Sequence, residues 1–468
     1  MLKQLYQIGN KFSPGLQKII RSVGWLSLEK ALSIALNLTV GVYLIRYLGS
    51  DDFGKLSYCL SIVGLFEALA KLGLDAIVVR SLVKEEEATS DILGTALILK
   101  LVSSLVTLVA IICVTYILKP DSQTYWLTAI VAMSLVFRST ETVDFWFQSR
   151  VLAKPIAIVR SSRLLIGHIL RLGFILLGLP LPAFVWLLLG EEIIRATGTI
   201  SIYRQYNRAA SNSSLGNRQS DQSQSIKHWK FNFDRAKTML KDSWPLILSG
   251  VMISIYMKID QVMLGSMAST EAVGNYASAV KFSEVWYFFP MAICSSVFPS
   301  ILQTKQRSTA EYYRKLQQLY DFMAWFSILV GLVMTVSSGI LINVLLGAEF
   351  LSAGKILAIH VWAAPFVFLG VARSQWLLSE NLTILSFACT MLGTITNLVL
   401  NFWLIPTYEG VGAAIATVIS YAVSSHVSCI FYPKMSATGW MITKALFIPV
   451  RIRQNITYVK SLKQYFSK

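Results

Sequence analysis

The sequence predicts an all-α polytopic membrane protein, and two features of its composition lead to this fold class. Of its 468 residues, 54% are hydrophobic and only 14% are charged, whereas soluble domains carry about 25% charged residues. The chain is also basic, with 42 Lys and Arg residues against 25 Asp and Glu residues. A basic nucleic-acid-binding protein would carry more charge, so we expect no nucleic-acid partner. The same composition excludes a soluble enzyme and a disordered chain.

Twelve segments are long and apolar enough to cross a bilayer, which takes about 20 residues. We therefore expect about 12 transmembrane helices. The segments are 22–45, 55–79, 92–118, 124–147, 156–178, 183–203, 245–264, 274–303, 318–346, 355–378, 383–405 and 410–432.

One long polar connection divides these spans into two groups of six. Residues 204–243 are rich in Ser, Asn and Gln, which is the composition of a linker. The sequence thus predicts two six-helix bundles around a central cavity. The predicted parts are a cytoplasmic N-terminal segment 1–21, a first bundle 22–203, a cytoplasmic linker 204–243, a second bundle 244–432 and a basic cytoplasmic or interfacial tail 433–468.

The Lys and Arg residues in the connecting loops, some of which overlap the ends of the spans, and in the two termini predict the orientation. One side would hold 29 of them and the other side 4. Because basic residues concentrate on the cytoplasmic side, we expect both termini and the linker there. The mixed apolar and basic tail is interpreted as lying on the membrane surface, attracted to anionic lipids, with a solvated tail as the alternative.

A short motif recurs in the two halves. The first outer loop reads Leu48-Gly49-Ser50-Asp51-Asp52-Phe53-Gly54, and the loop after the seventh span pairs Leu264-Gly265 with Val273-Gly274. In each copy we expect Leu-Gly to end a helix, with glycine in the left-handed conformation, and a polar residue to cap the next helix. Two related bundles are typical of a transporter with its cavity between them.

The spans also contain at least nine basic and at least nine acidic residues. Each charge at a helix centre costs roughly 2.5–3.5 kcal/mol on insertion scales. Charges in such number must face one another or water, so we expect a hydrated interior.

Three acids are candidates for ion coupling, namely Glu67, Asp75 and Asp260. Glu67, Lys71 and Asp75 recur every four residues and would share one helix face. Two interpretations are open: a self-neutralising ladder that holds the bundle together, or a polar wall with titratable carboxylates. The coupling ion would be H+ or Na+, and we expect no metal and no other cofactor.

Four cations are candidates for binding an anionic substrate, namely Lys100, Arg138, Arg171 and Lys258. The first three lie on different helices of the first bundle and could converge on one anionic group. Arginine suits bidentate capture of phosphate, and lysine acts as a point charge. Lys258 and Asp260 cannot pair along one helix face, so each needs a partner elsewhere.

Catalytic signatures are missing from the sequence. It contains no GxSxG, HExxH or P-loop motif, and its five cysteines have no CxxC spacing. We therefore predict a transporter without catalytic residues rather than an enzyme.

The chain resembles polysaccharide flippases (the O-antigen, Wzx-like family) of the superfamily that includes the MATE exporters. The resemblance rests on motifs spread over residues 20–432. They are Arg46-Tyr47-Leu48-Gly49 with Asp52-Phe53-Gly54, Trp244-Pro245-Leu246, Ile259-Asp260-Gln261, Glu284 with Trp286-Tyr287-Phe288, Leu346-Gly347 with Glu349-Phe350, Glu380-Asn381-Leu382 and Gly412-Ala413-Ala414.

This resemblance implies a function. A flippase would move undecaprenyl-pyrophosphate-linked oligosaccharide, such as an O-antigen or exopolysaccharide repeat unit, from the inner to the outer leaflet of the plasma (inner) membrane. The mechanism would be alternating access, with proton or sodium coupling left open. Expected partners are the lipid-linked oligosaccharide, membrane lipids, and a glycan polymerase and export proteins. The alternatives are a MATE-like multidrug or cation antiporter and a membrane glycan polymerase.

Overall fold

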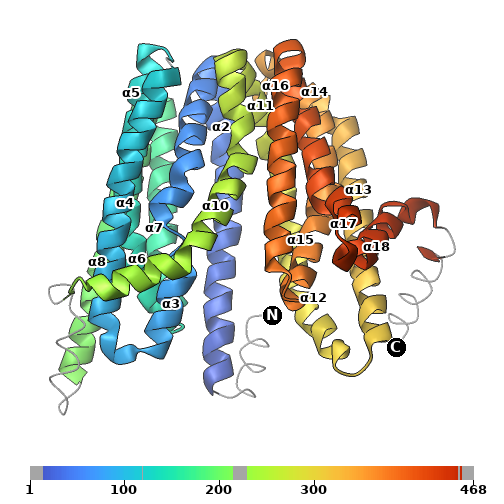
Figure 1. Ribbon diagram of the computed structural model, residues 1–468. Coiled ribbons are helices and arrows are strands. Elements are labelled where there is room, and N and C mark those ends of the chain that lie inside the picture. The colour runs from blue at the N-terminus through green and yellow to red at the C-terminus, as the bar shows by residue number, and fades with distance from the viewer. Residues whose placement is uncertain (1–13, 119, 214–228, 452–453, 456–468) are drawn as a thin grey trace, which may run out of the picture. The chain divides into compact units, whose positions relative to one another are not determined.

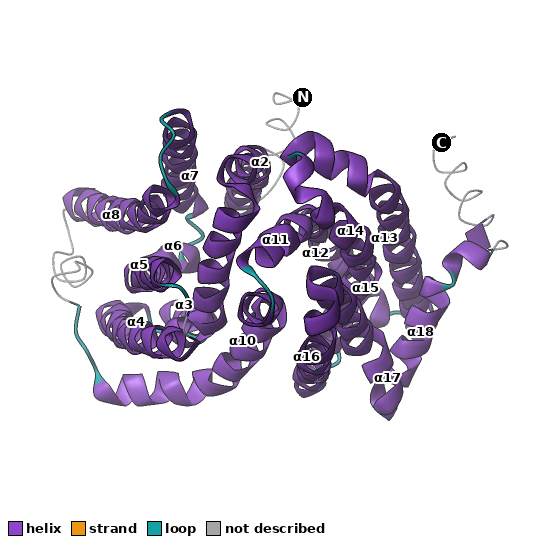
Figure 2. Cartoon of the chain, turned by 90° about the horizontal axis from the view of Figure 1, so that it is seen from above, coloured by secondary structure: helices purple, strands orange, loops and turns teal. Residues whose placement is uncertain are grey.

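The computed structural model describes residues 14–118, 120–213, 229–451 and 454–455. Helices dominate these residues, which contain no β-strand. They form two compact units (Figures 1 and 2). Unit 1 takes its residues from Met1–Leu48 and Cys59–Ser254, and unit 2 takes its residues from Gly49–Tyr58 and Ile255–Lys468.

Unit 1 is built from parts of two long helices and the helices between them. Its core joins apolar residues of α3, α4, α6 and α8, including Leu74, Ile92, Trp146 and Tyr203. Helix α4 packs on α5, and α8 packs on both α5 and α7. The elements are α2 (Pro14–Lys71), α3 (Asp75–Lys84), η1 (Glu86–Ala88), α4 (Thr89–Leu118), α5 (Ser122–Arg138), η2 (Ser139–Glu141), α6 (Thr142–Ser149), α7 (Ala153–Leu176), α8 (Leu181–Ser213) and the first part of α10 (Phe233–Met267).

Unit 2 contains the rest of α10 and the helices that follow. Helix α13 lies beside α12, α14, α15 and α18, and α16 packs on α14 and α15. The elements are α11 (Thr270–Glu284), η4 (Val285–Tyr287), α12 (Phe288–Lys305), α13 (Thr309–Leu346), η5 (Ala348–Phe350), α14 (Leu351–His360), η6 (Val361–Ala363), α15 (Ala364–Ser379), α16 (Thr383–Ala422), the π-helix η7 (Val423–Val427), α17 (Ser428–Phe431), η8 (Pro433–Met435), α18 (Ser436–Leu446) and η9 (Ile448–Val450).

The prediction of a polytopic helical membrane protein is confirmed. Each of the twelve predicted spans falls mainly on helical residues. Six continuous helical stretches among the described residues are long and apolar enough to cross a membrane. They are Glu86–Leu118, Phe233–Met267, Thr270–Lys305, Thr309–Leu346, Ala348–Ser379 and Thr383–Phe431. The last of these covers two predicted spans. Glu409, which lies between these two spans, does not have the helical conformation.

The second predicted span is not one continuous helix. Helix α2 ends at Lys71, and Leu72 and Gly73 turn the chain with positive φ angles of 53° and 58° before α3 begins at Asp75. Gly73 packs against the Leu246 side chain, and a Cβ at this position would clash with it. The single-face stripe expected for Glu67, Lys71 and Asp75 is therefore wrong, because the turn separates Asp75 from the other two.

The ends of the predicted linker and the start of the tail are helical. Helix α8 continues to Ser213 and α10 begins at Phe233, while residues 214–228 lie outside the described residues. In the tail, α18 packs on α13, where the Tyr320 and Thr438 hydroxyls are 2.8 Å apart and Gln317 donates to the Met441 carbonyl at 3.1 Å. This part of the tail is neither frayed nor fully solvated, because its Thr438, Ile442 and Ala445 are buried.

The two copies of the repeated motif differ in detail. Gly49 has the expected positive φ of 72°, and Ser269 caps α11 by accepting a hydrogen bond from the backbone N–H of Ala272. Gly265 does not end a helix, because α10 continues to Met267. It is instead a contact point, since a Cβ there would overlap the Tyr58 ring.

Within unit 2, Gly54 and Gly274 form a reciprocal close contact between α2 and α11. A Cβ on Gly54 would overlap the Thr270 carbonyl oxygen, and a Cβ on Gly274 would overlap the Ser50 carbonyl oxygen. Ser50 is held there by Glu349, which accepts its backbone N–H at 2.6 Å and its hydroxyl at 2.7 Å. Small residues permit such close approach of helices in membranes.

The close contact between Gly54 and Gly274 predicts that a larger residue at either position lowers the stability of the protein. We expect Gly54→Ala or Gly274→Ala to force α2 and α11 apart and to destabilise the protein by about 1–3 kcal/mol, as overpacking does. The matched control is Gly339→Ala in α13, where no atom lies within 4 Å of the added Cβ. Thermal unfolding of the purified protein in detergent measures the effect. Equal melting temperatures for all three variants would contradict the contact.

Candidate functional site

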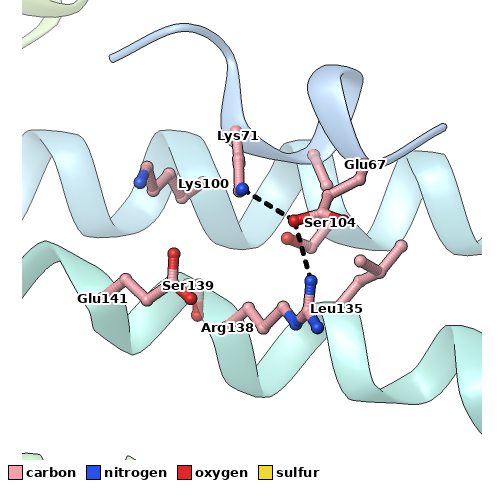
Figure 3. Close-up of a pocket in the computed structure, with 9 residues that line it drawn as sticks. Glu67, Lys71, Lys100, Ser104, Leu135, Arg138, Ser139 and Glu141 are labelled. Atoms are coloured by element: carbon pink, nitrogen blue, oxygen red, sulfur yellow. Dashed lines mark ion pairs between the residues drawn. The ribbon is translucent and has the colours of Figure 1, made fainter. Parts of the chain in front are cut away.

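A network of ion pairs runs through unit 1, and Glu67 is at one end of it. Its Oε1 accepts from Lys71 Nζ at 2.6 Å, one turn along α2, and from Arg138 Nη1 of α5 at 2.8 Å. Figure 3 shows both cations pointing at this carboxylate. The charges lie in the helix bundle, where an unpaired charge would be costly.

The network continues from Arg138 to α7 and α8. Arg138 Nε lies 3.8 Å from Glu192 Oε1, which also accepts from Arg163 Nη1 at 3.0 Å. Arg195 Nε binds the other oxygen of Glu192 at 2.7 Å. Each of these charges thus has a partner of opposite sign on another helix or one turn away.

Arg171 lies at the far end of the same network. Its Nη2 is 2.6 Å from Glu191 Oε1, and Arg163 Nη1 lies 4.0 Å from the other Glu191 oxygen. The predicted convergence of three cations on one group is therefore only partly found. Arg171 is connected to Arg138 through intervening ion pairs and does not share its pocket.

The pocket in Figure 3 does bring two of the predicted cations together. Its cavity volume is only about 10 Å³, which is room for about one water molecule. It is lined by Glu67, Ala70, Lys71, Lys100, Ser104, Leu135, Arg138, Ser139 and Glu141. Arg138 reaches it because α5 ends there and the 3₁₀ turn Ser139–Glu141 follows. A mid-span 3₁₀ turn often marks a functional position.

Lys100 and Asp75 form a separate pair at this pocket's edge. Lys100 Nζ donates to Asp75 Oδ1 at 2.8 Å and lies 4.4 Å from the centre of the Phe145 ring. The lysine is buried, whereas half of the Asp75 side-chain surface is exposed. A second opening has a cavity volume of about 320 Å³ and is lined by Glu67, Lys71, Asp75 and residues of α10. Glu67 and Asp75 thus both line this opening in unit 1.

Arg163 lies in the predicted span 156–178 but was not expected to be a site residue. The structure places it inside α7, where it bridges Glu191 and Glu192. The available signal was its spacing from Arg160, since residues three apart share a helix face. Glu192 and Arg195 were counted as membrane charges but were not recognised as the centre of the network.

Unit 2 contains a different arrangement around Asp260 of α10. Its Oδ2 accepts hydrogen bonds from the hydroxyls of Tyr276 and Thr417, and its Oδ1 accepts from Asn401 Nδ2, all at 2.6 Å. Asn401 Nδ2 also donates to Asn397 Oδ1 at 3.1 Å. Asp260 is 5% exposed. Neutral donors hold this buried carboxylate, and no Lys, Arg or His nitrogen among the described residues lies within 4 Å of it.

Lys258 lies two residues before Asp260 and is partly buried. No carboxylate of the described residues comes within 4 Å of its amine, in contrast to Lys100, Arg138 and Arg171. The expectation that Lys258 and Asp260 would not pair with each other agrees with this geometry. Their roles in binding and coupling stay predictions.

Two protein-family models match this chain. Residues 19–305 match the family model described as polysaccharide biosynthesis protein, which is more than half of the chain. The chain belongs to this family. Residues 245–403 also match the MatE family model, in agreement with the superfamily that the sequence motifs indicate. Membership in the polysaccharide biosynthesis family and the apolar helices together identify a multi-pass membrane protein.

Two curated relatives from Haloferax volcanii have similar sequences. One is named probable low-salt glycan biosynthesis flippase Agl15, and it is 26% identical over 235 residues, which is 47% of this chain and 48% of that protein. The other is named probable flippase AglR, and it is 30% identical over 188 residues, or 39% of each chain. The matched part of the chain spans less than half the length of these relatives.

Solved structures of two transporters share the fold. The lipid II flippase MurJ in an inward closed conformation has a TM-score of 0.64 at 16% identity, covering 94% of this chain and 98% of the other. An inward-facing multidrug resistance MATE family transporter of the MOP superfamily has a TM-score of 0.65 at 12% identity, covering 92% and 99%. At such identities the likeness concerns the fold alone.

Proposed function

We propose that this protein is a flippase that carries undecaprenyl-pyrophosphate-linked oligosaccharide from the inner to the outer leaflet of the plasma (inner) membrane. The observation that carries the proposal is the charged interior of unit 1 in a chain of the polysaccharide biosynthesis family. A polar path through a helical bundle suits a hydrophilic glycan, whose lipid tail would stay in the bilayer. The two Haloferax relatives are both named as probable flippases, which supports the proposed flippase function.

In this proposal the pyrophosphate is bound by cations that release a carboxylate of the protein and bind a phosphate oxygen in its place. Arg138 is the best candidate in unit 1, because a third of its side-chain surface is exposed at the pocket while its guanidinium holds Glu67. A phosphate oxygen that displaced Glu67 would take a bidentate partner of matching geometry. Lys100 and Arg171 are more deeply buried against carboxylates, so they would act through the network rather than by direct contact.

We place ion coupling at Asp260 rather than at Glu67 or Asp75. The latter two carboxylates are already neutralised by Lys71, Arg138 and Lys100. Asp260 has only neutral hydrogen-bond donors among the described residues, and Asn401 Oδ1 nearby is buried without a hydrogen-bond partner among them. A carboxylate with adjacent oxygen atoms can accept a proton or bind a sodium ion.

The proposed topology has both termini on the cytoplasmic side, following the distribution of Lys and Arg. The flipped lipid-linked oligosaccharide would then be used at the outer face by a glycan polymerase and export proteins. Because the function is transport of an intact molecule, the proposal assigns no covalent step to the protein.

Deletion of the gene tests the function. We expect surface polysaccharide to fall to background and lipid-linked oligosaccharide to accumulate in the cytoplasmic leaflet, where an added membrane-impermeant lectin cannot reach it in intact cells. The measurement is mass spectrometry of extracted lipids, with the wild-type gene restored as control. Unchanged polysaccharide and lipid pools, together with increased sensitivity to cationic drugs, would instead support a MATE-like exporter, the alternative that the MatE match favours.

A further inference from the structure

Unit 1 contains a larger pocket that the proposed pyrophosphate and ion sites do not use. It has a cavity volume of about 520 Å³ and lies between α2, α3, α6 and α7. The turn between α6 and α7 places residues of both helices on its wall, since Leu152 N–H returns to the Phe147 carbonyl at 2.9 Å. Its volume lies within the range of small-molecule pockets, which is about 300–1,000 Å³. Polar side chains that line it include Asp75, Glu141, Asp144, Gln148 and Arg160.

The charges on this wall do not suit a phosphate group. Three carboxylates face two cations, Lys71 and Arg160. Both cations already have partners: Lys71 Nζ holds Glu67 at 2.6 Å, and Arg160 Nη2 donates to Asp144 Oδ2 at 3.0 Å. The carboxylates are paired as well, Asp75 with Lys100 at 2.8 Å and Glu141 with Arg195 at 3.8 Å. An added anion would therefore have to displace a carboxylate from its cation, which disfavours pyrophosphate here.

The same wall suits a ligand that is rich in hydroxyl groups. A hydroxyl both donates and accepts, so it can bind a carboxylate, an amide and a guanidinium in turn. Gln148 is exposed at the pocket and presents both an acceptor and two donors. Apolar residues, among them Phe145 and Ile156, complete the wall and offer a surface for the C–H faces of a ring.

Asp144 provides an independent indication of a ligand. Its side chain is only 7% exposed, and its Oδ1 has no hydrogen-bond partner among the described residues, although Oδ2 is paired with Arg160. Buried polar atoms normally find a partner, and an unpaired carboxylate oxygen in the wall of a pocket is costly. A ligand hydroxyl that entered with a small shift of Arg160 would satisfy it.

We propose that this pocket binds sugar hydroxyls of the substrate's glycan, in a neutral or amine-bearing sugar rather than an acidic one. The inference rests on the proposed flippase function and deepens it, because it separates a glycan site at Asp144 and Gln148 from a pyrophosphate site at Arg138. Asp144 accepts from a hydroxyl, Gln148 donates to and accepts from neighbouring hydroxyls, and Arg160 orients Asp144.

The test uses the purified full-length protein and two probes. One is the free oligosaccharide repeat unit, released by mild acid from the host's own surface polysaccharide, and the other is undecaprenyl pyrophosphate without sugar. Binding of each is measured by calorimetry for Asp144→Asn, which keeps the side-chain shape, and for Gln148→Ala, which changes an exposed residue. The matched control is Gln205→Ala, an exposed glutamine of α8 that does not line the pocket.

We expect Asp144→Asn to weaken oligosaccharide binding about tenfold or more and Gln148→Ala about fivefold. Binding of undecaprenyl pyrophosphate should stay at the wild-type value in both variants, and Gln205→Ala should change neither. The inference is overturned if both variants bind oligosaccharide like the wild type, if they weaken both probes equally, or if the wild type binds no free oligosaccharide. The proposed function fails separately, by the absence of accumulated lipid-linked oligosaccharide after gene deletion.

Discussion

Replacing Arg138 by Gln is expected to weaken substrate binding and to reduce polysaccharide export about tenfold or more. Replacing Glu67 by Gln is expected to leave substrate binding equal or to make it tighter. The two side chains are joined at 2.8 Å, so a purely structural ion pair would respond similarly to the loss of either member. If Arg138 captures the pyrophosphate, Glu67 competes with the substrate for the same guanidinium. A lost hydrogen bond between charged groups is worth about 1.5–3 kcal/mol, which corresponds to roughly 10–100-fold in binding.

Binding of undecaprenyl pyrophosphate to the purified variants distinguishes the two roles. We expect weaker binding for Arg138→Gln and equal or tighter binding for Glu67→Gln. Each variant should lose only about 1–2 kcal/mol of stability, since both side chains are about one-third exposed. The control is Arg80→Gln, which breaks an ion pair of 2.6 Å with Asp242 at the surface of the same unit. Equal loss of binding in Glu67→Gln and Arg138→Gln would reject the phosphate role.

The fold could be predicted from the sequence to the extent that hydrophobic length determines it. Long apolar segments separated by short polar ones must be membrane helices, because no other arrangement satisfies the backbone in lipid. The turn at Leu72 and Gly73 was missed because it depends on the packing of Gly73 against Leu246, a residue distant in sequence. The packing of α18 on α13 likewise depends on tertiary contacts, such as that between Tyr320 and Thr438.

Which charged residues belong to the candidate site was easier to predict than which of them form ion pairs with one another. Counting charges within spans correctly indicated that they must face one another. Which acid meets which cation depends on how each helix is rotated about its axis, and only pairs one turn apart, such as Glu67 and Lys71, follow from spacing. Asp75 was expected beside Lys71 but binds Lys100 of α4. The partners of Asp260 were missed for another reason, because Tyr276 and Thr417 are neutral residues that are common in membrane helices.

Asp260→Asn is expected to abolish ion-driven transport, the largest single effect in unit 2. The substitution removes the negative charge that would attract the coupling ion and places an amide against three hydrogen-bond donors, from Tyr276, Thr417 and Asn401. An amide has one acceptor oxygen in place of two, so at least one donor loses its partner. We expect a stability loss of about 1–3 kcal/mol from this change.

The coupling role is separated from the stability loss by the effect of the ion itself. A bound ion stabilises the folded protein by RT ln(1 + [ion]/Kd), about 1.4 kcal/mol for each tenfold rise above Kd. We therefore expect the wild-type melting temperature to rise with sodium at constant ionic strength, or to depend on pH if the ion is a proton, and we expect Asp260→Asn to lose this response. The control is Asp321→Asn, which alters a buried carboxylate of the same unit that is paired with Arg451 at 3.3 Å. It should lower the melting temperature but keep the response to the ion. A response that persists in Asp260→Asn would place ion coupling elsewhere, with Glu67 and Asp75 as the remaining candidates.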